Sequence, residues 1–156
     1  MRLVKDYLPR AYADGTDIEA RAQMMSAAAM GATAFQKGLG AIHALSHPIG
    51  AVFGTHHGTT NAVCMPAVLA FNADEIRDRF DAAAAYLDID GGFDGFCDFV
   101  QDLNDSLGIP RKLSEMGADA ARIDELAAMA IDDPSCGGNP VVLTVENISG
   151  LYRQVI

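Results

Sequence analysis

The sequence has few basic residues and no long apolar run, and each shortage excludes a class of partner. Lysine and arginine total 11 against 21 acidic residues, which gives a formal net charge of -10 at pH 7. Nucleic acids and anionic membranes both attract positive surfaces, so neither is an expected partner. No stretch approaches the ~20 apolar residues that a membrane-spanning helix needs.

Cysteine is also scarce, and the three that occur, Cys64, Cys97 and Cys136, are far apart in the sequence. An odd number without CxxC spacing indicates reduced thiols rather than a disulfide framework. The first six residues lack the apolar run of a secretory signal. We therefore expect a cytoplasmic protein.

Strand signals are nearly absent, because only residues 141–145 are rich in β-branched side chains. Apolar residues instead recur at intervals of three and four, which is the pattern of amphipathic helices. The pattern predicts an all-α fold, a helical array that forms a single domain over residues 1–156 with at most a short strand near 141–145. The core is expected to be built from three apolar stripes, over residues 96–107, 123–131 and 148–156.

Capping signals mark where several of these helices should begin. Thr16 and Glu19 are spaced as a capping box before a helix expected over residues 17–36. Thr144 is the expected cap of the last helix, and Asn72 precedes another. Residues 24–35 are the most apolar segment, rich in alanine and glycine, and they predict a tightly packed core helix. Residues 1–8 are already amphipathic with no cap before them, so we expect the chain to be part of a longer protein.

All four histidines, His43, His47, His56 and His57, lie in one segment flanked by apolar or small residues. Imidazoles in such surroundings need a partner, and a metal ion is one candidate. On a helix His43 and His47 share a face, so spacing alone favours them as a chelating pair. A zincin motif is excluded because Ala44 stands where HExxH has its general base.

The pair His43 and His57 would be ~21 Å apart on one straight helix at ~1.5 Å per residue. Imidazole–metal bonds are ~2 Å long, so these two residues can share an ion only if the chain turns between them. Proline and glycine permit such a turn. The candidates between or beside the two histidines are Pro48, Gly50, Gly54 and Gly58.

The histidine segment resembles the signature of iron-containing alcohol dehydrogenases. The matching residues are HALSHPIG at 43–50, HG at 57–58, NA at 61–62 and MP at 65–66. The tail, with CGGNP at 136–140 and TVENI at 144–148, is similar to the C-terminus of the same family. The resemblance covers essentially the whole chain.

The resemblance implies a helical, dehydroquinate synthase-like C-terminal domain that binds a metal, which in this family is usually Fe(II) and sometimes Zn(II). One aspartate and three histidines bind the ion, and His43 and His57 match the last two histidine ligands. His47 matches a catalytic histidine that lines the site near the nicotinamide of NAD or NADP. His56 matches a variable position without a role.

The resemblance also implies what the chain lacks. The first aspartate and histidine ligands belong to an Asp-x-x-x-His segment upstream of Met1, and the N-terminal α/β domain for the cofactor is absent too. We expect the chain to be the C-terminal half of a metal-dependent NAD(P) alcohol dehydrogenase that acts on a small alcohol or aldehyde. Alone it should be inactive, and its uncovered apolar surface should make it a homo-oligomer.

Three other interpretations remain. A zinc-dependent relative, such as a glycerol dehydrogenase or a dehydroquinate synthase, has longer histidine spacing than this chain. A stand-alone helical metal-binding or interaction module without catalysis would need further ligands, for which Asp94 or Asp98 could serve. A purely structural domain would hold its histidines in the core, and metal analysis separates it from the others.

Overall fold

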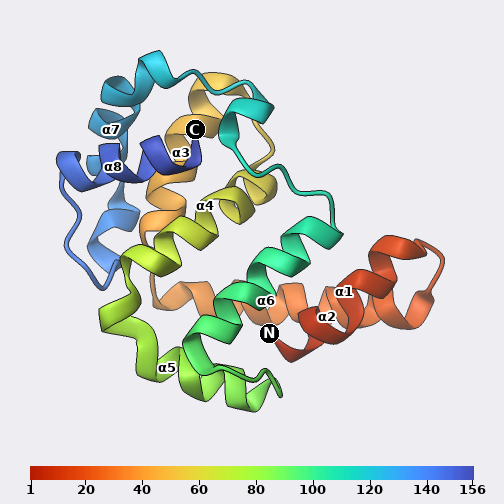
Figure 1. Cartoon of the computed structure of the whole chain (residues 1–156). Helices are drawn as coiled ribbons and strands as arrows, with labels where there is room; N and C mark the ends of the chain where they lie inside the picture. Colours follow the sequence, from red (N-terminus) through yellow and green to blue (C-terminus); the bar gives the residue numbers. More distant parts are fainter. The chain divides into compact units, whose positions relative to one another are not determined.

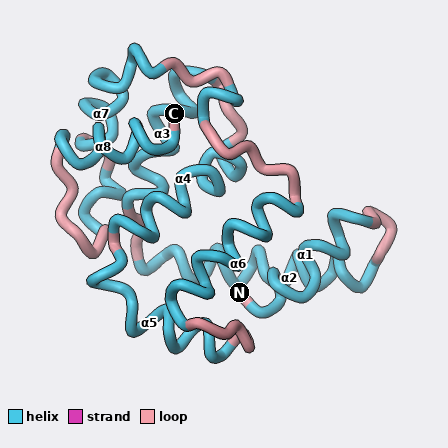
Figure 2. Tube along the Cα trace, viewed as in Figure 1, coloured by secondary structure: helices cyan, strands magenta, loops and turns pink.

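The computed structural model describes residues 1–156, and every regular element in it is a helix (Figures 1 and 2). The all-α fold class is thereby confirmed. Residues 141–145 form no strand, and Val145 is instead the first residue of the last helix. The α-helices are α1 (Arg2–Ala13), α2 (Ile18–Ala34), α3 (Ala41–Phe53), α4 (His57–Phe71), α5 (Ala73–Tyr86), α6 (Gly92–Ser106), α7 (Ile123–Ile131) and α8 (Val145–Val155). The short 3-10 helices are η1 (Phe35–Lys37), η2 (Leu113–Met116), η3 (Ala120–Arg122) and η4 (Pro134–Gly138).

Side-chain caps begin helices close to the predicted positions. The Thr144 hydroxyl accepts from the Asn147 N–H at 3.2 Å, and the Asn147 side chain accepts from the Thr144 N–H at 2.9 Å, so α8 has the predicted cap. The cap of α2 was predicted one residue too early. Asp17, not Thr16, accepts from the Ala20 N–H at 2.9 Å. Aspartate is the stronger N-cap of the two residue types.

The chain divides into two compact units, each with more contacts within itself than with the other. The first unit comprises Met1–Lys37 and Asp78–Leu107, and the second comprises Gly38–Arg77 and Gly108–Ile156. The chain passes from one unit to the other three times, and one of these boundaries, between Arg77 and Asp78, falls within α5. The single domain over residues 1–156 stays a prediction.

In the first unit α1 packs against α2, but α2 is not the buried core helix that its apolar composition predicted. Met25 is 75% exposed and Met30 is 65% exposed, and Ala20 is the one buried residue of the helix. Much of the apolar character of α2 comes from alanines, which lie on all sides of the helix and do not form a stripe along one face. Such a helix has no single face to bury.

The stripe over residues 96–107 lies on α6, which belongs to the first unit. The ring centroids of Phe96 and Phe80 are 4.8 Å apart, and those of Phe80 and Phe93 are 6.1 Å apart, in edge-to-face arrangements. Aromatic rings favour this geometry over face-to-face stacking. The predicted single core of three stripes therefore needs correction, because this stripe packs in a different unit from the other two.

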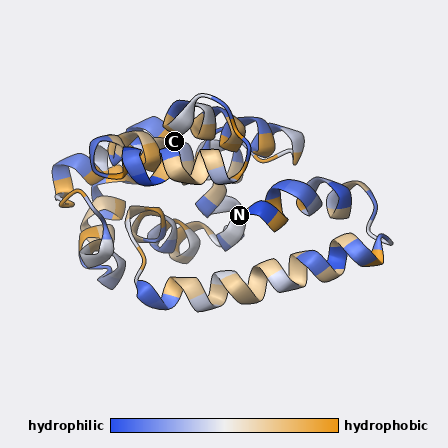
Figure 3. Ribbon diagram, turned by 90° about the horizontal axis from the view of Figure 1, so that it is seen from below, coloured by the Kyte–Doolittle hydropathy of each residue, from blue (hydrophilic) through white to orange (hydrophobic).

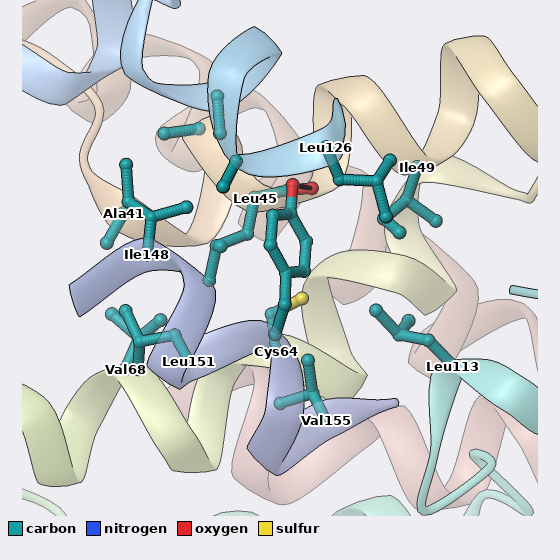
Figure 4. Close-up of a cluster of buried hydrophobic side chains, with 14 of the residues drawn as sticks. Ala41, Leu45, Ile49, Cys64, Val68, Leu113, Leu126, Ile148, Leu151 and Val155 are labelled. Atoms are coloured by element: carbon teal, nitrogen blue, oxygen red, sulfur yellow. Dashed lines mark hydrogen bonds between the residues drawn. The ribbon is translucent and has the colours of Figure 1, made fainter. Parts of the chain in front are cut away.

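The core of the second unit is formed by α3, α4, α7 and α8 (Figure 4). The stripes of α7 and α8 contribute as predicted, while the contribution of α3 and α4 was not predicted. Tyr152 of α8 is fully buried, and its hydroxyl donates to the Leu45 carbonyl of α3 at 2.8 Å. Burial raises the pKa of Tyr152, because the charged phenolate is poorly solvated there.

None of the helices combines the length and the hydrophobicity that crossing a membrane requires. Hydrophobic and hydrophilic residues are mixed along the helices, as Figure 3 shows.

Replacing Tyr152 by Phe should lower the free energy of unfolding by about 1–2 kcal/mol, because the Leu45 carbonyl loses a buried donor while the ring still fills its space. Urea unfolding followed by circular dichroism measures the change. Tyr12→Phe is the matched control, since Tyr12 is 63% exposed and should tolerate the same change. Equal unfolding midpoints for the two variants would show that the buried hydrogen bond contributes nothing.

Candidate metal centre

The two helices that carry the histidines are joined by a turn at Gly54. Gly54 ends α3 with φ 65° and ψ 27°, a left-handed conformation that glycine adopts without a steric penalty. His56 then caps α4, where its Nδ1 accepts from the Thr59 N–H at 3.3 Å. Of the four predicted turn residues only Gly54 makes the turn. Pro48 and Gly50 lie inside α3, and Gly58 lies inside α4.

This turn brings the three histidines of interest together in the second unit. The ring centroids of His43 and His57 are 5.3 Å apart, and those of His43 and His47 are 5.7 Å apart. The Asn61 Nδ2 atom lies 3.4 Å from Nε2 of His43 and 3.1 Å from Nε2 of His57. Both ring nitrogens are therefore directed at the same atom, the Asn61 amide nitrogen. The Asn61 Oδ1 atom is buried beside them without a hydrogen-bond partner.

His47 makes a different contact, which separates it from the other two imidazoles. Its Nδ1 atom lies 2.7 Å from Oδ2 of Asp133, at the start of η4. Its ring stacks on that of His57 with a centroid distance of 5.4 Å and an interplanar angle of 18°. Ring proximity alone would allow either predicted chelating pair. The directions of the ring nitrogens favour His43 with His57.

Local electrostatics favour an uncharged imidazole at His43. Burial lowers the pKa of His43, and repulsion from His57 and His47 lowers it further, against a smaller opposing effect of Asp133. The neutral imidazole is the form that can bind a metal ion. Partial burial acts to raise the pKa of Asp133, but hydrogen bonds from Ser135 and His47 outweigh it, so this pKa lies below its usual value.

Helices α3 and α4 form a helical hairpin with its turn at Gly54, and Asn139 connects the two helices at the opposite end. Its Oδ1 accepts from the Ala41 N–H at the start of α3 at 3.1 Å and from Nδ2 of Asn72 at 3.0 Å. Its Nδ2 donates to the Asn72 Oδ1 at 2.8 Å and to the Val141 carbonyl at 2.7 Å. Asn72 is the C-cap of α4. One side chain thus connects the start of α3 with the end of α4.

Two polar residues of the site had no role assigned from the sequence. Asn61 belongs to the quoted signature and lies one helical turn after His57, a spacing that places the two side chains on one face of α4. Asp133 precedes Pro134, a pattern typical of a helix start, and it caps η4. Nothing in that pattern indicates a contact with His47.

No group of three or more histidine, cysteine, aspartate or glutamate side chains in this chain is arranged to hold a metal ion. Asp94 and Asp98, the additional ligands considered for a stand-alone module, lie on α6 in the first unit.

The Fe-containing alcohol dehydrogenase family has a model of its C-terminal region, and residues 1–156 match it, so this chain belongs to that family. The predicted resemblance is thereby confirmed. The chain is 43% identical over 157 residues to a 4-hydroxybutyrate dehydrogenase of Cupriavidus necator, covering 95% of this chain and 41% of that protein. It is 36% identical over 164 residues to an NAD-dependent methanol dehydrogenase of Bacillus methanolicus, covering 100% of this chain and 43% of that protein.

The fold is similar to that of a 1,3-propanediol oxidoreductase of known structure, with a TM-score of 0.94 and 28% sequence identity. The match covers 99% of this chain and 43% of that one. The chain therefore spans about two fifths of the length of the relatives it matches.

Substitutions at Gly54 and Gly50 should have opposite effects on stability, because only Gly54 lies in the turn. Gly54→Ala should lower the free energy of unfolding by about 1–2 kcal/mol, since alanine is strained at positive φ, and Gly54→Asn should cost less. Gly50→Ala should instead stabilise the chain by about 0.5–1 kcal/mol, because Gly50 is helical and a Cβ would meet no atom within 4 Å. Thermal unfolding measures all three. A Gly54→Ala chain as stable as Gly50→Ala would mean that the turn does not require glycine.

Proposed function

We propose that this chain is the metal-binding helical half of an NAD- or NADP-dependent alcohol dehydrogenase that acts on small alcohols or aldehydes. Membership of the Fe-containing alcohol dehydrogenase family supports the reaction class. The observation that carries the site is the common direction of the His43 and His57 Nε2 atoms. The cytoplasm is the proposed location, and a homo-oligomer is the proposed assembly.

His43 and His57 would hold Fe(II), or Zn(II), through these nitrogens. The donor set fits such an ion, since both imidazole nitrogens are directed at the same atom and the neutral form is favoured at His43. A bound ion would act as a Lewis acid on the oxygen of the alcohol or carbonyl substrate. Two imidazoles do not complete a four-ligand shell, so the remaining ligands would come from the part of the enzyme that precedes this chain.

His47 would line the same site and face the nicotinamide. Its side chain is 41% exposed, so it can reach a bound substrate, while its stacking on His57 keeps it next to the ligand pair. An imidazole can accept the hydroxyl proton of an alcohol and return it in the reverse reaction. The neighbouring His56 has a structural part instead, as the cap of α4.

The isolated chain should bind Zn(II) more weakly than a complete four-ligand site, and His43→Ala or His57→Ala should abolish that binding. Calorimetric titration with Zn(II) measures the affinity. His56→Ser is the control, because it removes a neighbouring imidazole and supplies another good N-cap for α4. Tight one-to-one binding by the isolated chain would point to a stand-alone metal-binding module instead.

The isolated chain should not oxidise alcohols with NAD⁺ or NADP⁺, because without a held cofactor hydride transfer loses an orientation effect of ~7–11 kcal/mol. Co-expression with an upstream α/β half that ends in the Asp-x-x-x-His segment should restore metal content and turnover. In that enzyme His43→Ala or His57→Ala should abolish both. His47→Ala should keep the metal and lower kcat by about 10²–10⁴-fold.

The readouts are the rate of nicotinamide reduction and the metal content of the purified enzyme. Appreciable turnover by the 156-residue chain alone would contradict the proposal that it is half of the enzyme.

A further inference from the structure

Asp133 is the one acidic side chain in contact with a histidine of the site. Its Oδ2 atom lies 2.7 Å from Nδ1 of His47, and its side chain is 12% exposed, against 41% for the imidazole. The carboxylate of this short contact is therefore largely shielded from water, while the imidazole is partly exposed.

Asp133 is itself fixed by the backbone around it. Its other oxygen, Oδ1, accepts from the Ser135 N–H at 2.8 Å and so caps η4. Pro134 restricts the backbone between the two residues, and η4 packs against α3, the helix of His47. The Cys136 thiol donates to the Ala130 carbonyl of α7 at 3.0 Å, which anchors η4 to a second helix. Each carboxylate oxygen therefore has its own donor, and neither is free to rotate away.

The Asp133 carboxylate determines which ring nitrogen of the neutral His47 imidazole carries the hydrogen. An ionised carboxylate only accepts hydrogen bonds, so Nδ1 of His47 must carry a hydrogen to make this contact. In the neutral ring the other nitrogen, Nε2, then keeps a free lone pair. Stacking on His57 restrains the plane of the ring. The ring is held at Nδ1 and on one face, which leaves Nε2 as its available atom.

We propose that Asp133 is the positioning residue of His47, which holds its imidazole in the Nδ1–H tautomer with the Nε2 lone pair available to a substrate hydroxyl. This inference rests on the proposed function of His47 for its catalytic consequence. The tautomer itself can be measured without any activity. Free histidine prefers the opposite, Nε2–H form, so the carboxylate is expected to reverse that preference.

Two substitutions separate this role from the capping of η4. Asn is a good N-cap, and in Asp133→Asn the Ser135 N–H still needs the Oδ1 acceptor. The amide NH₂ group then faces His47, and its donors favour a bare Nδ1 and an Nε2–H ring. Ser also caps well, but in Asp133→Ser the side chain is too short to reach His47. The matched control is Asp132→Asn, which removes the same charge from the adjacent, exposed residue.

The test is ¹⁵N NMR of the histidine ring nitrogens in the 156-residue chain at a pH where His47 is neutral. The wild-type chain and Asp132→Asn should show His47 as Nδ1–H. Asp133→Asn and Asp133→Ser should show it mainly as Nε2–H, with the His56 signals unchanged as evidence of an intact fold. An Nδ1–H ring in both Asp133 variants, or an Nε2–H ring in the wild-type chain, would overturn the inference.

In the enzyme restored with its N-terminal half, Asp133→Asn should lower kcat by about 10- to 100-fold with metal content and KM little changed. Removing the hydrogen-bond partner that orients a metal-binding histidine typically costs about 10–100-fold, and we expect a loss of the same order for His47. If the restored wild-type enzyme has no activity, the proposed function fails while the tautomer result still supports the positioning role. If it is active and Asp133→Asn has the wild-type kcat, the inference fails and the proposed function stands.

Discussion

The reversal of the chain at Gly54 is the constraint on which the rest of the site depends. A residue in the left-handed region ends α3, and two residues later the cap of α4 starts the return helix. Because of this short connection the imidazoles of His43 and His57, which one straight helix would hold far apart, have ring centroids 5.3 Å from each other. The same turn places Asn61 between them. A longer loop would leave the register of the two helices undetermined, and with it the direction of both Nε2 atoms.

The segment after α7 contributes two further contacts to the helices that the turn at Gly54 brings together. Asp133 contacts His47, which lies in the middle of α3, and the Asn139 side chain accepts from the Ala41 N–H at the start of the same helix. Gly138 allows this approach, since a Cβ there would clash with the Leu39 carbonyl oxygen. A single stretch of chain therefore serves two purposes. It holds the hairpin closed through Asn139, and it presents a carboxylate to His47.

Patterns confined to one helix were predictable from the sequence, while properties that depend on distant neighbours were not. The stripes of α7 and α8 and the Thr144 cap follow from local spacing and hydrogen bonding. The exposure of α2 could not be inferred, since the same alanines are compatible with a core or a surface. Spacing favoured His43 with His47, and the family signature was needed to select His57. The contact of Asp133 with His47 joins residues 86 positions apart, and no periodic pattern marks such a pair.

The imidazole pair and the His47–Asp133 contact also differ in the length of the chain loop that each contact closes. The contact of Asn61 with His43 spans 18 residues within one helical hairpin, whereas the carboxylate reaches His47 across 86. Local contacts cost less chain entropy and form faster than distant ones. During synthesis on the ribosome both imidazoles and the turn at Gly54 are added to the chain long before residue 133. We therefore expect the contact of His47 with its carboxylate to form after the contact of Asn61 with His43.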